Sequence, residues 1–228
     1  MNKLFIDQYE IKTSRTEQKV PVVNSVHLHS IYNPYKEAEA LLDKYTEAIS
    51  NNSEVLVLGL GFAYHVNELV ERMTKTHGEN FRIVVIEPNM SVYNDCLDLN
   101  LLNKKNILVY AGYSPRELYA DGDLVHFLLK KPIVIAHPPS FNLCQIYFKD
   151  FLSFEAPTKI GESMDFVSHA SVRKYLESFD QDKTFKEILK TSIAEQSKFQ
   201  SMDFLAMALY EMTKGTQGMN QKEKSGDL

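Results

Sequence analysis

Cysteine is scarce in this sequence, since Cys96 and Cys144 are the only two among 228 residues. Each lies in a stretch whose pattern predicts a helix. Two isolated thiols provide neither a disulfide framework nor a thiolate metal cluster. This usage fits a reducing compartment, so the sequence predicts a cytoplasmic protein.

Long hydrophobic runs and a surplus of positive charge are also missing. No segment approaches the roughly 18 apolar residues of a membrane span, and the short apolar run at the start is interrupted at Asp7. The formal net charge is -5, and the pI is about 5.8. A basic face, which binding to nucleic acid or anionic membranes requires, is not expected. We predict no nucleic-acid partner, no membrane insertion and no export signal.

Several catalytic and metal-binding motifs are absent. The sequence contains neither the G-x-S-x-G elbow of serine hydrolases nor the lysine motif of a P-loop. Its histidines show neither H-E-x-x-H spacing nor paired His/Cys spacing, so we expect no metal site. Most of these histidines should lie at the surface or be satisfied by hydrogen bonds. They are His27, His29, His65, His77, His126, His137 and His169.

The composition is that of a folded protein, with 44% hydrophobic and 24% charged residues. Residues 1–30 mix β-branched and aromatic residues around a polar centre, which predicts a hairpin or small sheet that serves as a lid or as the arm of a homodimer. Residues 31–160 are predicted to form a Rossmann-like nucleotide-binding core. A helical extension over 161–213 and a flexible tail over 214–228 complete the predicted organisation.

Strands and helices alternate from Glu54 onward. The apolar segments VLVL, RIVVIE, ILVY and PIVIA predict four strands, with amphipathic stretches between them. Strand and helix in turn imply crossover connections and a parallel sheet. The predicted fold class is therefore α/β: a Rossmann-like three-layer sandwich with a mostly parallel sheet, an amino-terminal β-hairpin and carboxy-terminal helices.

Helix starts are marked by capping residues. Asn33, followed by Pro34, predicts the start of one helix whose apolar stripe continues to Ile49. Ser114 and Glu117 have the spacing of a capping box. Further helices are predicted over residues 91–102, after the HPPS segment, over 163–179 and from 184 to about 213.

The turn after the strand VLVL carries Gly59 and Gly61, with a helix starting at once. Glycines let backbone N–H groups approach a ligand where a β-carbon would block it. The next strand ends in Glu87, whose carboxylate can accept hydrogen bonds from ribose hydroxyls. Glycine turn and acid together predict a nucleoside pocket. Tyr64 takes the place of the third glycine of the dinucleotide pattern, which argues against NAD, whereas Ala63 is closer to the turn of S-adenosylmethionine-binding folds.

One alternative for this turn is the cofactor site of an S-adenosylmethionine-dependent methyltransferase. Those enzymes usually carry an acid before the first glycine, whereas this sequence has Leu58 there. The glycines can also serve only to pack the helix against the strand, without any ligand.

The segment HPPS, which begins at His137, follows the strand PIVIA. It is similar to the Asn/Asp-Pro-Pro-aromatic loop that amino-group methyltransferases place beside the substrate nitrogen. Neutral His137 can accept one hydrogen bond from an amine, although Ser140 stands where the aromatic residue would be. A plain turn, stiffened by two prolines, explains the segment equally well.

The segment HSIYNP places His29 and Ser30 before a helix whose amino end attracts anions. We predict that both residues lie beside the nucleotide pocket. The alternative is that Ser30 and Asn33 only satisfy free N–H groups while Tyr32 packs.

The motifs HSIYNPYKEAEALL, VLVLGLGFAYHVNEL, VVIEPN and HPPS come in an order that resembles the amino-terminal domain of motility accessory factors. The resemblance covers 26–154. Those bacterial proteins are associated with the transfer of nonulosonic acids to flagellin. The family's turn commonly has glycine where Ala63 stands, and the roughly 75 residues after Phe154 leave no room for its central transferase domain. No catalytic residue is therefore assigned.

The resemblance implies a pocket for a nucleotide-type small molecule, and possible protein partners are flagellin or a glycosylation enzyme. Its cofactor would be a nucleotide or nucleotide sugar, with S-adenosylmethionine as the alternative if the protein is a methyltransferase. A third possibility is a non-catalytic interaction module. The predicted cofactor-binding residues are Gly59, Gly61, Tyr64, Glu87, His29, Ser30 and His137.

Overall fold

The computed structural model describes residues 8–103, 105–167 and 169–194. The chain divides into two compact units, Met1–Phe154 and Glu155–Leu228, which are described separately below. In the described ranges, no helix has the combination of length and apolar character that crossing a bilayer requires.

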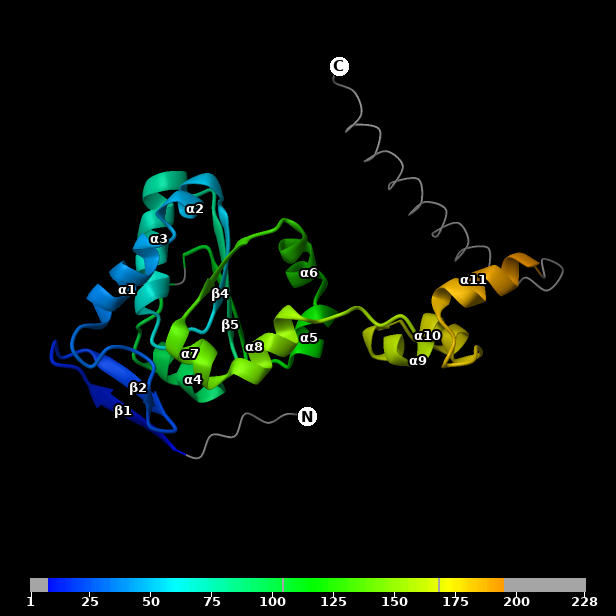
Figure 1. Cartoon of the computed structure of the whole chain (residues 1–228), viewed down its shortest axis with the longest axis horizontal. Helices are drawn as coiled ribbons and strands as arrows, with labels where there is room; N and C mark the ends of the chain where they lie inside the picture. Colours follow the sequence, from blue (N-terminus) through cyan, green and yellow to red (C-terminus); the bar gives the residue numbers. More distant parts are fainter. Residues whose placement is uncertain (1–7, 104, 168, 195–228) are drawn as a thin grey trace, which may run out of the picture. The chain divides into compact units, whose positions relative to one another are not determined.

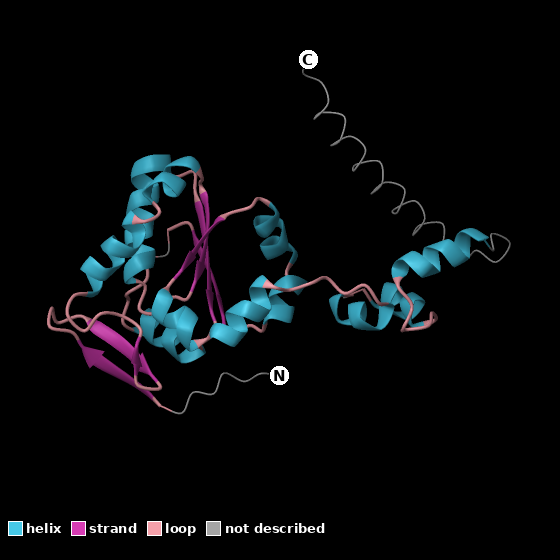
Figure 2. Cartoon of the chain, in the orientation of Figure 1, coloured by secondary structure: helices cyan, strands magenta, loops and turns pink. Residues whose placement is uncertain are grey.

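The first unit is built around a four-stranded sheet in which every pair of neighbours is parallel (Figure 2). Its strand order is β6-β5-β4-β7, with β4 and β5 at the centre. The apolar segments found in the sequence form these strands. Their bounds are β4 Glu54–Leu58, β5 Arg82–Glu87, β6 Ile107–Ala111 and β7 Ile133–Ala136.

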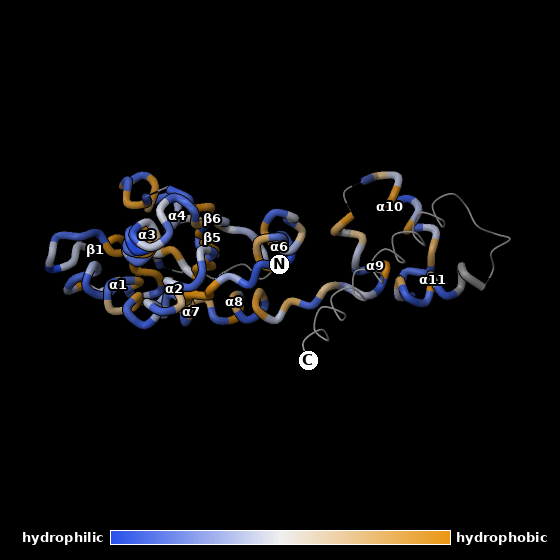
Figure 3. Tube along the Cα trace, turned by 90° about the horizontal axis from the view of Figure 1, so that it is seen from above, coloured by the Kyte–Doolittle hydropathy of each residue, from blue (hydrophilic) through white to orange (hydrophobic). Residues whose placement is uncertain are grey.

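Helices cover both faces of this sheet, because alternate strand residues point to opposite sides. Val55 and Val57 belong to the hydrophobic core on the face of α1, α2 and α3, whereas Leu56 and Leu58 belong to the core on the face of α5, α6 and α8 (Figure 1). Each fully buried aliphatic side chain stabilises the fold by roughly 1.5–3 kcal/mol. In Figure 3, strands β5 and β6 contain hydrophobic residues, whereas α3 contains both hydrophobic and hydrophilic residues. The three-layer α/β prediction is confirmed.

The helices begin largely where the capping residues predict. Asn33 accepts from the N–H groups of Tyr35 and Lys36, and Ser114 and Glu117 form the complete capping box. The helix expected to continue to Ile49 is instead two helices. The bounds in the first unit are α1 Pro34–Asp43, α2 Thr46–Asn51, α3 Tyr64–His77, α4 Met90–Asp98, α5 Pro115–Ala120, α6 Gly122–Leu129, α7 Pro138–Leu143 and α8 Gln145–Leu152.

A small antiparallel sheet of order β1-β2-β3 precedes the core. Its strands are β1 Tyr9–Thr13, β2 Lys19–Val23 and β3 Val26–His27. Positive φ angles at Asn24 (48°) and Ser25 (65°) make the tight turn between β2 and β3. The Tyr64 hydroxyl of α3 donates to the Lys19 carbonyl at 2.7 Å. This bond ties the small sheet to the start of the helix that follows the glycine turn.

The second unit is helical where it is described. Ile160, Leu176 and Ile188 form its small buried core. The helix expected over 163–179 is interrupted, and the long helix expected from 184 is seen as α11; its continuation to 213 and the tail over 214–228 lie outside the described residues. The elements are α9 Ile160–Ser163, the 3-10 helix η1 Met164–Phe166, α10 Ala170–Glu177 and α11 Phe185–Ala194.

Candidate functional site

The strand order defines one place where segments diverge. The chain passes from β4 to its neighbour β5 and on to β6, then returns to the other side of β4 as β7. In open parallel sheets, the crevice at the carboxyl ends of two such strands is the usual ligand site. Here the segment leaving β4 carries Gly59 and Gly61, and the segment leaving β7 carries His137 and Ser140.

The glycine turn is tightly wound, with φ of +96° at Gly59 and +50° at Gly61. A β-carbon on Gly59 would collide with the β-carbon of Ser140, and one on Gly61 would collide with the imidazole of His29. Both glycines are therefore required by close packing. The space directly over the turn is filled by side chains of this chain.

Glu87 is buried at the end of β5, with only 2% of its surface exposed. Its Oε2 accepts from the N–H of Leu60 at 2.7 Å and of Gly61 at 3.4 Å, and its Oε1 accepts from the N–H of Asn89 at 2.8 Å. Burial raises the pKa of Glu87 to about 7, although these three N–H groups act in the opposite direction. The N–H groups of the glycine turn were expected to face a ligand, but those of Leu60 and Gly61 instead donate to this carboxyl group.

Asn89 caps helix α4, and its Oδ1 accepts from the N–H groups of Ser91 and Val92 at 3.0 and 3.3 Å. Since Oδ1 is an acceptor in both bonds, the other amide atom is the nitrogen, a donor. This Nδ2 is buried and has no hydrogen-bond partner among the residues that the structure describes. A donor without a partner therefore lies two residues after Glu87.

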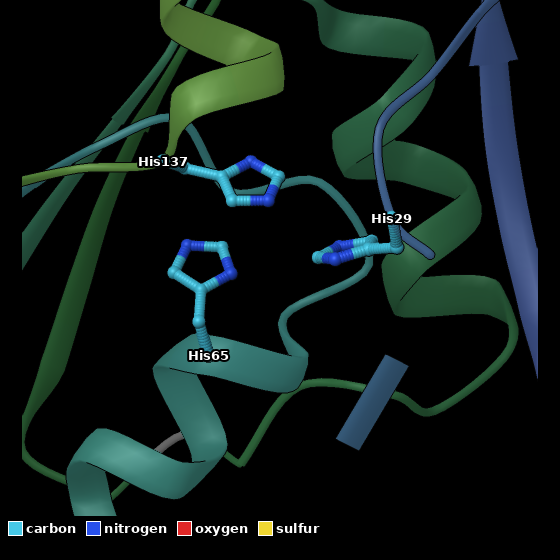
Figure 4. A group of neighbouring side chains, drawn as sticks. All are labelled: His29, His65 and His137. Atoms are coloured by element: carbon cyan, nitrogen blue, oxygen red, sulfur yellow. The ribbon is translucent and has the colours of Figure 1, made fainter. Parts of the chain in front are cut away.

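Three histidines meet on the other flank of the β4 end. His29 follows β3, His65 is the second residue of α3, and His137 follows β7; their exposed fractions are 3%, 2% and 2%. Figure 4 shows the three imidazole rings, carried by three separate segments, turned toward one another. One ring nitrogen from each lies within 4.8 Å of the others. The rings of His65 and His137 are stacked, with centroids 4.2 Å apart.

Hydrogen bonds determine which nitrogen of the neutral His29 and His65 rings carries the proton. Nε2 of His29 accepts from the N–H of Phe62 at 2.9 Å, so its Nδ1 carries the proton, 3.5 Å from a carboxylate oxygen of Glu37. Nε2 of His65 lies 3.0 Å from the carbonyl oxygen of Gly59 and must donate to it. Its Nδ1 is then an acceptor, and this atom is buried without a partner.

His137 differs, because the Ser140 hydroxyl that bonds it can either donate or accept. Its Nδ1 lies 2.8 Å from the Ser140 hydroxyl. Its Nε2 is buried and has no partner. The cluster therefore holds two polar ring nitrogens that this part of the chain leaves unsatisfied.

Burial disfavours the charged form of all three imidazoles. Burial lowers the pKa of His29 and His137, and it lowers the pKa of His65 to about 3. Desolvation penalises the charged form, and each additional imidazolium would repel the next. Neutral imidazoles keep the lone pairs that accept hydrogen bonds or bind cations.

The other predicted site residues lie close by. The Tyr64 ring packs edge-on against His29, with centroids 4.9 Å apart. Ser30 closes the turn before α1, because its Oγ accepts from the N–H groups of Tyr32 and Asn33. The seven predicted residues thus lie at or next to one edge of the sheet. His65 was not among them, and its only sequence signal was its position at the start of the helix that follows the glycine turn.

An apolar groove of about 350 Å³ lies elsewhere, at the amino end of β7. It offers almost no polar group for orienting a ligand. Its lining residues are Leu56, Tyr119, Val125, Leu128, Leu129, Lys131, Pro132, Val134, Phe151 and Leu152.

The fold and the edge just described define a Rossmann-like α/β protein with a candidate ligand site at the carboxyl ends of its strands. No family model matches the sequence, and no curated protein matches it either. Among solved structures, the chain is similar to the crystal structure of MNMC2 from Aquifex aeolicus, with 13% identity and a TM-score of 0.35. The similarity covers 51% of this chain and 46% of that one, so it spans about half of each.

Proposed function

We propose that this protein binds a nucleotide-type small molecule at the carboxyl edge of its sheet, on the Glu87 side of the glycine turn. The observation that carries the proposal is the buried Asn89 amide nitrogen, a donor with no partner two residues after Glu87. A buried donor of this kind is costly unless an acceptor reaches it. A ribose hydroxyl or a phosphate oxygen is such an acceptor.

The segment over 26–33 covers this edge, and in the proposal it moves when the ligand enters. His29 lies over Gly61, and its bond to the Phe62 N–H holds the segment in place. The cover also presents apolar and aromatic side chains to solvent: Ile31 is 39% exposed and Tyr32 57%. Aromatic rings beside a polar pocket can stack on a nucleobase. Glu87, once the turn is uncovered, accepts from the ribose.

The biological setting that we propose is bacterial flagellin or surface glycosylation, with a function related to that of the amino-terminal module of motility accessory factors. The four motifs in the family's order support it. The test is deletion of the gene in the bacterium that encodes it, followed by mass spectrometry of intact flagellin. Loss of a glycan mass supports the proposal, and an unchanged flagellin mass contradicts it.

A second candidate function is methyl transfer from S-adenosylmethionine. One observation favours it: Ser140 of the HPPS segment packs directly on Gly59, so the loop that would hold the acceptor adjoins the glycine turn. The hydrophobic Leu58 before that turn leaves the methionine amine of the cofactor without an acidic partner.

Isothermal titration calorimetry separates the two functions. Cytidine and uridine nucleotides and S-adenosylmethionine are titrated separately into the full chain and into Asn89→Ser. Serine retains the capping oxygen and removes only the amide donor. We expect the wild type to bind a pyrimidine nucleotide and Asn89→Ser to bind it about tenfold more weakly, which corresponds to the loss of about one hydrogen bond.

The matched control is Asp121→Ser, which changes the cap of α6, where Asp121 accepts from the Leu124 N–H. Its affinity should equal that of the wild type. Binding of S-adenosylmethionine alone would support methyl transfer. A wild-type protein that binds none of these compounds contradicts both functions.

A further inference from the structure

The cluster of His29, His65 and His137 is a second feature of the same edge. Its members come from three segments that the fold brings together at the switch point between β4 and β7. We propose that these three side chains bind a divalent transition-metal ion of the kind that prefers imidazole ligands, with zinc as the representative occupant. Zinc, copper, nickel and iron share this preference.

The two unpartnered nitrogens carry the proposal. Nδ1 of His65 and Nε2 of His137 are buried, and neither has a hydrogen-bond partner within the described part of the chain. Buried polar atoms of native proteins are nearly always satisfied, so each exception requires an explanation. In the tautomer in which His137 Nδ1 donates to the Ser140 hydroxyl, a cation bound between the two free nitrogens would use both lone pairs.

The polar group near the second nitrogen of each ring also supports a metal site. Histidines that bind metals usually donate their other N–H to a carboxylate, a carbonyl or a similar acceptor, which fixes the tautomer. His29 faces Glu37 in this way, His65 faces the Gly59 carbonyl, and His137 faces the Ser140 hydroxyl. Three buried imidazoles that each have such an acceptor behind them match the arrangement of a metal site more closely than that of an accidental contact.

Coordination requires the ring nitrogens to move closer together. Zinc binds nitrogen at about 2.0–2.1 Å, so the ligand atoms of a tetrahedral site lie about 3.3 Å apart. The nitrogens of this cluster lie within 4.8 Å of one another. Because lone pairs lie in the ring plane and the rings of His65 and His137 differ by only 8°, one ring must turn to share an ion. His29 must exchange its bond to the Phe62 N–H for the metal.

Three histidines leave one tetrahedral position for water or for a group from outside the chain. Zinc sites with three protein ligands and one open position are typical of catalysis, whereas structural sites are closed by four protein ligands. Among the described residues, the cluster of potential ligand atoms contains these three histidines and no carboxylate. The inferred site is therefore open at one position.

Two substitutions remove the free nitrogen of a ring and keep its hydrogen bond. In His65→Gln the amide nitrogen can still donate to the Gly59 carbonyl, and in His137→Asn the amide can still bond to the Ser140 hydroxyl. An amide is a poor ligand for zinc, which prefers thiolate, imidazole and carboxylate. The control is His126→Asn, because His126 is exposed on α6, outside the cluster.

The experiment uses untagged full-length protein, stripped with a chelator and titrated with Zn²⁺ against a competing fluorescent chelator. Circular dichroism first confirms that each variant is folded. We expect about one ion per chain in the wild type and in His126→Asn, and affinities weaker by about tenfold or more in His65→Gln and His137→Asn. Titration with Co²⁺ should produce the visible absorption bands of a nitrogen-ligated ion in the first two proteins only. A wild type that binds no zinc, or zinc affinity that survives in both cluster variants, overturns the proposal.

Discussion

The two flanks of the β4 end differ in how their buried polar groups are satisfied. On the Glu87 flank, both carboxyl oxygens accept backbone N–H groups, and they hold the glycine turn in shape. On the histidine flank, two ring nitrogens have no partner. A buried polar group left unsatisfied costs roughly 1–3 kcal/mol. Glu87 therefore supports the glycine turn, whereas the histidine cluster keeps two buried ring nitrogens without a partner among the described residues.

The Asn89 amide adds detail to this contrast. It lies on the Glu87 flank, yet its nitrogen has no partner. The flank therefore combines an acid engaged by the backbone with one donor left for a ligand. A nucleotide would use that donor first, and it would reach Glu87 only after the turn is uncovered.

The largest effect should come from Gly59→Ala, which tests whether the turn is filled by side chains. Alanine at φ +96° is strained, and its β-carbon would collide with Ser140. We expect a loss of roughly 2–5 kcal/mol in the free energy of unfolding, measured with urea, from the sum of backbone strain and overpacking. Gly78→Ala is the matched control, since Gly78 has φ +63° but no atom within 4 Å of the added β-carbon. It should lose only about 1–2 kcal/mol; equal losses at both sites would show that the turn is not filled.

A smaller effect should appear in the pH dependence of stability. The pKa of Glu87 is about 7 in the folded protein and about 4.5 in a free side chain. Between these values the folded state binds more protons than the unfolded state, so this carboxyl group makes the protein less stable as pH rises from 4.5 to 7. We expect the stability of the wild type to fall by roughly 2–3 kcal/mol relative to Glu87→Gln across that window.

Urea unfolding of both proteins at pH 5 and pH 8 measures this difference. The lowered pKa values of the histidines change the stability in the opposite direction at acid pH. Because both proteins contain these histidines, their contribution cancels when the two stabilities are compared. A difference that does not change with pH would show that Glu87 is not desolvated, and the contrast between the two flanks would then disappear.

The smallest effect is expected for His65→Gln and His137→Asn when a chelator is present. Each variant keeps one hydrogen bond and exchanges one unpartnered polar atom for another. We expect changes below about 1 kcal/mol in the free energy of unfolding. A loss of more than about 2 kcal/mol would mean that the free nitrogens already take part in stabilising contacts within the chain.

Much of the fold followed from local patterns. The strand RIVVIE spans the predicted residues, and the caps at Asn33 and Ser114 form as expected. Predictions of helix continuity were less accurate, since a stripe of apolar residues does not reveal where a helix is interrupted. The helix from Asn33 breaks before Thr46, and the one expected over 163–179 is divided among α9, η1 and α10.

The predicted site was only partly visible in the sequence. The glycines and Glu87 were identified because they follow strands, and strand ends meet at one edge of a parallel sheet. The direction in which Glu87 points, and the filling of the turn by His29 and Ser140, depend on contacts between distant segments. Spacing alone also could not reveal the histidine cluster, whose members are 36 and 72 positions apart.

The sequence by itself determined the alternation of strands and helices, the positions of the caps and the two glycines that permit a sharp turn. These features depend on interactions between residues a few positions apart, which a linear pattern records. Only the tertiary structure decided that three histidines meet and that an acid supports the turn. Such contacts depend on strand order and on the return of β7 to the side of β4, because these place residues from separate segments within a few ångströms of one another.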